Sequence, residues 1–411
     1  MKYIRPRWFG RNLEAALRVL PVAVVTGARQ TGKTTLVKTL GPGRAYLTLD
    51  DVGVLDQAGR HPDALLARRP VTLDEVQRTP SLLLAVKRAV DEQRRAGDFL
   101  LTGSANLWLM DRVADTLAGR AIYLELPPFC PAEWQQRKQM LRPLDRLFAA
   151  DFDLAEWPDD AGDWTAWLLR GGFPPALAIA DDAERALWFA AYVQTYLERD
   201  LRQLSAVSSL PDFQRVMALS AHRTGRLLNQ ADLARDAALT HPTTHRYLNL
   251  LETGCLVTRI RPFASNPTVA LVKTPKLLWN DCGLAAALAG LKTPSEIAAR
   301  PDAGFWLEQT LFQTLQAWRA LDPLHRQIHF WRDRPGREVD FILEQDGRLV
   351  ALEIKTSGIV TGADAAGLRA FRESLRSKTT LVRSAVLHAG PGRPLEAGVL
   401  ALPWSWMVAA R

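Results

Sequence analysis

The sequence predicts an α/β protein whose N-terminal part forms a parallel sheet. Short apolar stretches recur there and alternate with helical stretches, which is the pattern of a sheet buried on both faces. A glycine-rich loop follows the first of these stretches directly. A further group of strands near the end of the chain predicts a second, separate α/β domain. The N-terminal stretches cover residues 22–25, 45–49, 71–73, 99–101 and 122–126.

The composition of the chain is that of a globular protein with two or three domains. It has 411 residues, an apolar fraction of 47% and a charged fraction of 23%. Its formal net charge of +8 attracts polyanions, so nucleic acid is a reasonable class of partner. A solvated surface with more arginine than glutamate would carry the same charge, and both interpretations stay open.

The three cysteines have neither the spacing of a zinc site nor that of a disulfide framework. We expect Cys130, Cys255 and Cys282 to be small core residues in a reducing compartment. The N-terminus lacks the apolar region of a signal peptide, and no run of about 18 apolar residues occurs. The sequence therefore predicts a cytoplasmic protein without a membrane segment.

The loop after the first apolar stretch fits the phosphate-binding P-loop, GxxxxGK[ST]. Its glycines let the backbone turn its N–H groups toward a β-phosphate, and the following helix directs its positive dipole end at the same anion. Lys33 is expected to reach the β- and γ-phosphates, and the Thr34 hydroxyl to ligate Mg²⁺. The predicted ATP-binding residues are Gly27, Ala28, Arg29, Gln30, Thr31, Gly32, Lys33, Thr34 and Thr35.

Two adjacent carboxylates, Asp74 and Glu75, follow the apolar stretch 71–73. After a P-loop, such a pair predicts two roles at one strand tip. Asp74 would hold the magnesium ion, directly or through water, and Glu75 would polarise the attacking water. Two ordinary surface acids are the alternative.

The apolar stretch 99–101 also ends in small polar residues. In a parallel sheet this tip lies beside the γ-phosphate, so Ser104 or Asn106 is expected to position the water, unless the segment is only a strand-to-helix turn. The γ-phosphate also needs a cationic donor. Arg120 is the first candidate and Arg112 and Arg170 are the others, and an ordinary surface arginine is the alternative for each. If Arg120 acts on a neighbouring subunit, the protein must form a homo-oligomer.

The chain divides into four segments. Residues 1–135 hold the predicted sheet, and residues 136–225 are helical. In the segment 226–299, two helices at 229–237 and 243–252 precede a β-rich stretch at 255–261, which predicts a winged helix-turn-helix with a linker. Residues 300–411 form the second α/β domain.

The start of the second of these helices is suited to phosphate and base-edge contacts with DNA. The candidate residues there are Thr240, Thr243, Thr244, His245 and Arg246. Arg259 and Arg261 on the wing would add backbone contacts. Winged helices in ATPases also pack as lids or bind proteins, so both interpretations stay open.

The C-terminal segment carries a pattern of carboxylates that suits a metal ion. Asp340 and Glu353 lie on strands joined by a tight turn, and strand alternation places Glu353 and Lys355 on one face. Two carboxylates and a lysine can hold one Mg²⁺ and activate water for phosphodiester cleavage, and Glu308 would complete the cluster. A salt-bridged hairpin explains the same residues.

These motifs together resemble those of the bacterial and archaeal AAA-type ATPases that carry a C-terminal DUF4143 domain. The matching motifs lie at 27–34, 73–77, 101–104, 117–120, 127–134, 171–174, 338–341 and 353–355. The resemblance implies a P-loop ATPase core (1–135), a helical lid (136–225), a winged helix (226–299) and a restriction-endonuclease-like C-terminal domain (300–411).

The C-terminal pattern is similar to that of PD-(D/E)xK nucleases, with D…ExK intact. Val339 stands where the pattern has proline. The same residues also occur in non-cleaving relatives that keep the fold as a binding module.

Two functions follow from these expectations. The first is an ATP- and Mg²⁺-dependent ATPase that acts on DNA, with nuclease activity left open. The second is a nucleotide-gated switch whose terminal domains bind protein in signalling or defence, with an inactive nuclease-like module.

Overall fold

The computed structural model describes residues 5–40, 43–103, 117–136, 142–157, 162–195, 207, 209–264, 274–375 and 380–408. The chain forms two compact units. Unit 1 comprises Met1–Pro128 with Leu250–Leu256, and unit 2 comprises Phe129–Asn249 with Val257–Arg411. Among the described helices, none has both the length and the apolar character needed to cross a membrane.

Unit 1 is built on a five-stranded sheet with the order β2-β3-β4-β1-β5. Every neighbouring pair in this sheet is parallel, which confirms the predicted parallel α/β arrangement. The central strands lack an exposed residue because helices cover both faces. The strands are β1 (Val22–Thr26), β2 (Ala45–Thr48), β3 (Val71–Asp74), β4 (Phe99–Thr102) and β5 (Ala121–Glu125).

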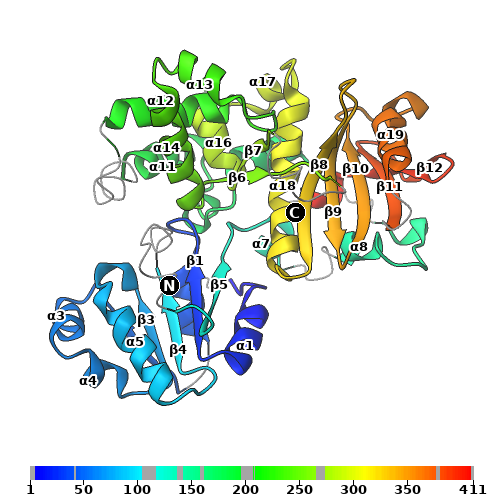
Figure 1. The fold of residues 1–411 in the computed structure, drawn as a ribbon. Coiled ribbons are helices and arrows are strands. Elements are labelled where there is room, and N and C mark those ends of the chain that lie inside the picture. Colours follow the sequence, from blue (N-terminus) through cyan, green and yellow to red (C-terminus); the bar gives the residue numbers. More distant parts are fainter. Residues whose placement is uncertain are drawn as a thin grey trace. The chain divides into compact units, whose positions relative to one another are not determined.

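The helices of unit 1 pack on the two faces of this sheet (Figure 1). One face forms a core in which Val22, Leu73 and Leu101 contact apolar side chains of α3, α4 and α5. The α1 helix contacts β1, and α2 contacts β4. The helices are α1 (Gly10–Val19), α2 (Lys33–Thr39), α3 (Val52–Arg60), α4 (Pro62–Leu66), the 3₁₀ turn η1 (Val76–Arg78) and α5 (Ser81–Glu92).

Unit 2 begins with short helices that surround a longer, buried one, α18 (Ala303–Ala320). The α18 helix contacts α9, α16 and the strands β7, β8 and β10. The helices before it are α7 (Pro131–Trp134), α8 (Arg142–Arg146), η4 (Leu154–Glu156), α9 (Trp164–Arg170), α10 (Pro174–Leu177), α11 (Asp182–Thr195), α12 (Leu210–Ala221), α13 (Gln230–Asp236), α14 (His241–Thr253), α16 (Cys282–Leu288) and α17 (Pro294–Ala298).

The segment that was expected to form a winged helix-turn-helix contains α13, α14 and a two-stranded antiparallel sheet, β6 (Val257–Ile260) with β7 (Lys276–Trp279). The Asn229 side chain accepts hydrogen bonds from the first backbone N–H groups of α13 and caps it. The two helices and the strand β6 follow one another as predicted, whereas the partner strand β7 was not predicted.

The C-terminal part of unit 2 is a mixed sheet with the order β12-β13-β11-β10-β9-β8. The strands β8, β9 and β10 run antiparallel, whereas β10, β11 and β13 run parallel. The α19 helix (Ala366–Ser374) covers one face (Figure 1). The strands are β8 (Arg326–Arg332), β9 (Glu338–Gln345), β10 (Arg348–Ile354), β11 (Thr380–His388), β12 (Arg393–Glu396) and β13 (Val399–Pro403), and the 3₁₀ turns are η6 (Gly362–Ala365) and η7 (Ser405–Met407).

The glycine pair between α9 and α10 is held by one buried carboxylate. Gly171 ends α9 with φ of 65°, and the Gly172 N–H donates to Asp281 Oδ2 at 2.6 Å. The other oxygen of Asp281 accepts from Leu284 N at 2.7 Å and caps α16. A side chain on Gly172 would collide with Phe129 O and Gln313, so this position requires glycine.

All three cysteines are buried as free thiols. Cys130 and Cys282 are fully inaccessible, and Cys255 is 6% exposed. This agrees with the prediction that they are small core residues.

We expect Asp281→Asn to destabilise unit 2 by about 1–3 kcal/mol, because one of two buried N–H donors would face an amide N–H instead of an oxygen. Burial raises the pKa of Asp281 to about 6. A raised carboxyl pKa contributes stability below the unfolded value of about 4, and this contribution is lost as the pH rises through about 6. The difference in unfolding free energy between wild type and Asp281→Asn should therefore become smaller as the pH rises from about 4 to about 6.

Urea unfolding of both proteins between pH 4 and pH 7 measures this difference. A difference in unfolding free energy that is constant with pH would show that folding does not shift the pKa of Asp281.

Candidate functional site

The glycine loop of unit 1 connects β1 to α2. Two of its glycines have positive φ angles, 137° at Gly27 and 95° at Gly32, as does Gln30 at 61°. A Cβ atom on Gly27 would lie 2.6 Å from Leu126 O, so a larger residue does not fit there. The loop therefore has the backbone shape that the phosphate-binding motif requires.

The Lys33 side chain lies across this loop and is 6% exposed. Its Nζ donates to the carbonyl oxygens of Gly27 and Ala28, at 2.8 Å each. Burial lowers the pKa of Lys33, while the charges of Glu75 and Asp74 oppose this shift. The carbonyl oxygens of the loop thus hold the ammonium group, and the oxygens of a bound anion can replace them.

Arg7 stabilises the glycine loop by hydrogen bonds from the N-terminal segment. This role was not identified from the sequence. Its guanidinium donates to Thr31 O and to Pro127 O, at 2.7 Å each. It therefore ties the loop to the segment that follows β5. The only signal in the sequence is a basic N-terminal lead, which does not indicate such a contact.

Asp74 lies at the end of β3, is 2% exposed and faces the start of α2. Its Oδ2 accepts from the Thr34 hydroxyl at 2.9 Å and from the Tyr46 hydroxyl at 2.6 Å. Its Oδ1 accepts from the Thr102 hydroxyl. The structure thus brings together Thr34 and Asp74, the two oxygen donors that were assigned to magnesium.

Tyr46 and Thr102 were not identified from the sequence, because their role depends on the strand order. Tyr46 lies on β2 and Thr102 ends β4, the two neighbours of β3. Burial and the hydrogen bond to Asp74 raise the pKa of Tyr46, so its hydroxyl stays a donor at neutral pH. These hydroxyls orient the Asp74 carboxylate.

Glu75 has a left-handed backbone, with φ of 62° and ψ of 39°. This conformation costs a non-glycine residue on the order of 1–3 kcal/mol and is most frequent at functional sites. The Glu75 N–H donates to Thr102 Oγ1 at 3.4 Å, and its carboxylate accepts from the Gln77 amide. The turn therefore fixes the backbone of Glu75 directly after Asp74, at the tip of β3.

An Mg²⁺ ion fits this edge of the sheet, because it prefers hydroxyl, carboxylate and phosphate oxygens as ligands. Within the described ranges, no group of three or more His, Cys, Asp and Glu side chains could hold a metal by itself. Such a site would take its other ligands from phosphate and water, as in P-loop proteins generally.

Among the remaining candidates for the γ-phosphate region in unit 1, the structure describes Arg120. Ser104, Asn106 and Arg112 are outside the described residues. Arg120 precedes β5 and therefore lies at the amino edge of the sheet, opposite the glycine loop, where it pairs with Asp91 at 2.6 Å. This position does not fit contact with a phosphate bound in the same subunit, so only action on a neighbouring subunit remains as a hypothesis.

The predicted carboxylates of unit 2 surround a lysine that the sequence did not indicate. Lys276 on β7 is 2% exposed, and its Nζ lies 3.2 Å from Glu308 Oε2 and 3.7 Å from Asp340 Oδ1. It also pairs with Glu338. Burial lowers the pKa of Lys276, and the three carboxylates raise it by more. A protein cation thus lies among the oxygens that were assigned to a metal ion.

Glu353 and Lys355, the other two residues of the D…ExK pattern, form a separate ion pair. Lys355 Nζ donates to Glu353 Oε1 at 2.6 Å, on one face of the strand as predicted. Asp340 Oδ2 accepts from the backbone N–H of Ile354 at 2.7 Å. Burial and the charge of Asp340 raise the pKa of Glu353 to about 8. The structure therefore brings Asp340 near the ExK strand, where Ile354 N–H bonds one of its oxygens and Lys276 Nζ lies 3.7 Å from the other.

We expect Lys276→Met to destabilise the protein by about 3–5 kcal/mol, because it leaves buried carboxylates without a counter-ion. Added Mg²⁺ or Mn²⁺ should raise the melting temperature of this variant more than that of the wild type. Thermal unfolding with and without the metal measures both effects, and Lys292→Met, at an exposed lysine, is the control. Equal melting temperatures of wild type and Lys276→Met would contradict this electrostatic account.

Three family models match the chain in succession. A model described as an AAA domain matches residues 20–135, and a domain of unknown function (DUF4143) matches residues 303–406. A second domain of unknown function (DUF8612) matches residues 161–295. Together these ranges contain the glycine loop, the helical and β6–β7 segments and the C-terminal sheet.

Two mycobacterial proteins are similar to nearly the whole chain. The uncharacterized protein Rv2008c of Mycobacterium tuberculosis is 30% identical over 397 residues, which cover 95% of this chain and 82% of that protein. The uncharacterized protein Mb2031c of Mycobacterium bovis matches to the same extent.

Solved structures with similar parts have low sequence identity. The Walker-type ATPase paby2304 of Pyrococcus abyssi has a TM-score of 0.41 and 16% identity, over 70% of this chain and 99% of that one. AMPPCP-bound DnaA of Aquifex aeolicus has a TM-score of 0.29 and 16% identity, over 59% of this chain and 86% of that one. On its family models and its mycobacterial relatives, the chain belongs to the AAA-type ATPases that carry a C-terminal DUF4143 domain.

Proposed function

We propose that this protein hydrolyses ATP with Mg²⁺ in unit 1 and uses the cycle to change its action on DNA through unit 2. The contact between Thr34 and Asp74 beneath the glycine loop is the observation that carries the first part of this proposal. It brings the two predicted magnesium donors together at the carboxyl edge of the sheet, where P-loop proteins bind phosphates.

We assign Lys33 the role of neutralising the negative charge of the phosphates. Its ammonium exchanges the carbonyl oxygens of Gly27 and Ala28 for phosphate oxygens, which gives stronger, charge-assisted hydrogen bonds. The N–H groups of the loop and of the start of α2 donate to the same anion. Mg²⁺, when bound, offsets the phosphate charge that develops during transfer.

We assign Glu75 the role of general base for the attacking water. Its left-handed turn directly follows Asp74, and the Gln77 amide donates to its carboxylate and restricts the rotation of the side chain. The Thr102 hydroxyl donates to Asp74 and accepts from the Glu75 N–H, so one side chain orients the Asp74 carboxylate and holds the backbone of Glu75. Glu75 accepts a proton from water while Asp74 keeps its place near Thr34.

We expect Glu75→Gln to keep ATP binding but to lower the hydrolysis rate by about 10²–10⁴, the usual contribution of a general base. Lys33→Ala should lose both binding and turnover. Nucleotide binding by calorimetry and phosphate release separate the two effects. Glu92→Gln, an exposed residue at the end of α5, is the matched control. Wild-type turnover in Lys33→Ala would refute the assignment of the site.

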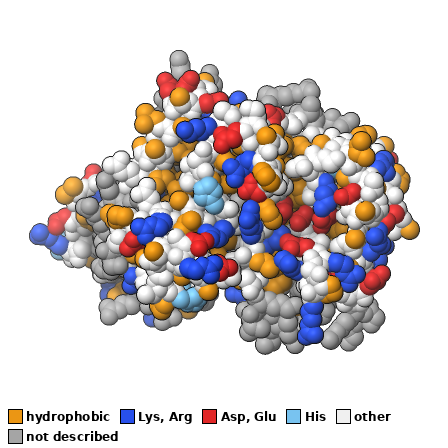
Figure 2. Space-filling view, turned by 90° about the horizontal axis from the view of Figure 1, so that it is seen from above, with side chains coloured by type: hydrophobic (Ala, Val, Ile, Leu, Met, Phe, Trp, Pro, Cys, Tyr) orange, Lys and Arg blue, Asp and Glu red, His pale blue; other side chains and the backbone are white. Residues whose placement is uncertain are grey.

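The segment with α13, α14 and the β6–β7 sheet is assigned to DNA as a winged helix. His245 and Arg246 are exposed near the start of α14, whereas Thr244 is buried and donates to Thr240 O at 3.2 Å. Thr244 therefore stabilises the helix start and is removed from the expected contact surface. Figure 2 shows one face of the molecule, on which basic and acidic side chains are interspersed.

The C-terminal domain is assigned to binding without cleavage, as a nuclease-like module. Lys276 lies among Glu308, Glu338 and Asp340, and Lys355 is paired with Glu353. A divalent ion would have to displace a buried ammonium group from its carboxylates. This observation also supports a second candidate function, in which the protein is a nucleotide-gated switch that binds another protein.

Binding of fluorescent duplex DNA across salt concentrations tests the DNA assignment. We expect affinity to fall steeply between about 50 and 200 mM salt, because phosphate contacts release counter-ions. Arg246→Ala should weaken binding, and Arg60→Ala in α3 should not. The DNA should stay intact with Mg²⁺ or Mn²⁺. Absence of binding at about 50 mM salt would favour the protein-binding switch, and metal-dependent cleavage would refute the non-cleaving assignment.

A further inference from the structure

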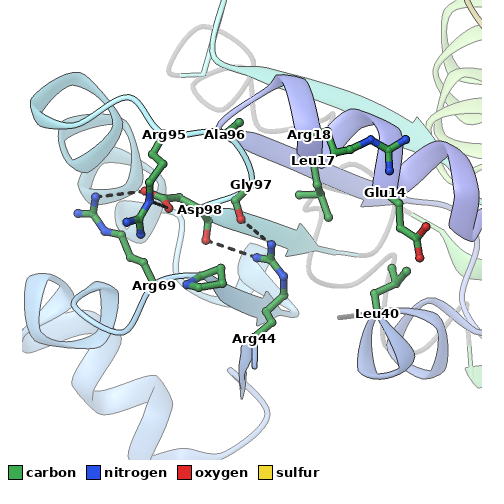
Figure 3. A pocket seen from close by; sticks show the side chains of 11 residues that line it. Glu14, Leu17, Arg18, Leu40, Arg44, Arg69, Arg95, Ala96, Gly97 and Asp98 are labelled. Carbon is green, nitrogen blue, oxygen red and sulfur yellow. Dashed lines mark hydrogen bonds and ion pairs between the residues drawn. The ribbon is translucent and has the colours of Figure 1, made fainter. Parts of the chain in front are cut away.

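A cavity of about 550 Å³ lies at the amino edge of the sheet in unit 1, on the opposite edge from the glycine loop (Figure 3). The end of α1 forms one wall, and the segments that lead into β2, β3 and β4 form the other. Four of the side chains that line it are arginines: Arg18, Arg44, Arg69 and Arg95. Since the strands of a parallel sheet are several residues long, about 15 Å separate this edge from the Asp74 edge.

Two of the arginines are fixed by one buried carboxylate. Asp98 is 2% exposed, and its oxygens pair with Arg95 Nε at 2.7 Å and with Arg69 Nη1 at 3.5 Å. Arg69 also donates to Leu66 O at 3.2 Å, and its guanidinium lies 5.3 Å from the centre of the Phe99 ring. The positions of these two cations are therefore set before any ligand arrives.

Arg44 is held by carbonyl oxygens (Figure 3). Its Nη2 donates to Gly97 O at 2.5 Å, and its Nη1 to Val71 O at 3.1 Å and Asp98 O at 3.4 Å. Gly97 has φ of 75°, and a Cβ there would lie 2.8 Å from Leu17 O, so glycine is needed to present this carbonyl. Within the described residues, Arg44 has no ion pair with a carboxylate.

The charge of the pocket is not balanced by its own residues. Four guanidinium groups face two carboxylates, Glu14 and Asp98. Carbonyl oxygens orient Arg44 but do not neutralise it, and burial lowers its pKa, which reflects the cost of keeping this charge away from water. An anion in the cavity would offset this cost.

We propose that this pocket binds a small phosphate-bearing molecule, at a site separate from the ATP site. Guanidinium groups recognise phosphate through paired, charge-assisted hydrogen bonds, and their fixed positions reduce the entropy lost on binding. The volume suits a ligand of nucleotide size. Leu17, Leu40 and Pro70 also line the cavity and offer an apolar surface to the rest of the ligand.

The test uses inorganic pyrophosphate as the probe and the full chain carrying Lys33→Ala, without nucleotide or magnesium. In this chain the glycine loop is expected to contribute no binding. Calorimetry should detect one saturable site at low salt. A nucleoside diphosphate should compete for it, which would distinguish a nucleotide effector from free phosphate compounds.

Two substitutions locate the site. Arg18→Gln removes an exposed side chain at the end of α1, and Arg44→Gln removes the cation held by carbonyl oxygens. Each should weaken pyrophosphate binding at least tenfold, about 1.4 kcal/mol. Arg60→Gln, at an arginine whose side chain is 73% exposed on α3, should bind like the parent chain. Unchanged melting of Arg18→Gln shows that the loss is not a folding defect.

Three outcomes would overturn the proposal. One is the absence of saturable binding, and another is equal affinity in the Arg18→Gln, Arg44→Gln and Arg60→Gln chains. The third is binding of duplex DNA at this pocket without binding of pyrophosphate, which would assign the arginines to a nucleic-acid backbone. None of these results depends on ATP hydrolysis, so the proposal and the proposed ATPase activity can fail separately.

Discussion

The burial of polar side chains on α18 is the constraint around which unit 2 is arranged. This helix is buried over most of its length, so each of its amide and hydroxyl groups needs a partner inside the protein. Gln309 bonds both backbone groups of Trp279, at 2.8 and 2.7 Å, and Gln313 donates to Phe129 O at 2.6 Å. Thr314 donates to Met407 O at 2.9 Å. The helix thereby joins the beginning, the middle and the end of unit 2.

The same constraint explains the charge cluster beside this helix. Glu308 on α18 is buried, and burial together with the charge of Asp340 raises its pKa well above the ordinary value. Lys276 compensates this charge from β7, so the β6–β7 sheet and the C-terminal sheet share one set of ion pairs. A carboxylate pattern that resembles a nuclease site in the sequence is therefore part of the interior packing of unit 2.

Unit 1 depends on a different feature, the two edges of one parallel sheet. At the carboxyl edge, hydroxyl groups from β2 and β4 orient Asp74, and a strained turn holds Glu75 next to it. At the amino edge, Asp98 and a set of carbonyl oxygens fix three guanidinium groups. Because the strands run in the same direction, residues that precede them and residues that follow them gather at opposite edges. Arg120 belongs to the amino edge for this reason.

The sequence by itself determined the features that depend on local order. The glycine loop, the Asp74-Glu75 pair, each buried strand of the first sheet and the D…ExK spacing are each contained in a short stretch, in which residue type and period specify the backbone. Only the tertiary structure decided which side chains from distant parts of the sequence contact the residues of these stretches. Tyr46, Thr102 and Arg7 reach the phosphate edge from other strands and from the N-terminal lead, and Lys276 reaches the carboxylates from β7. Their contacts arise from strand order and from the pairing of buried charges, which no local pattern encodes.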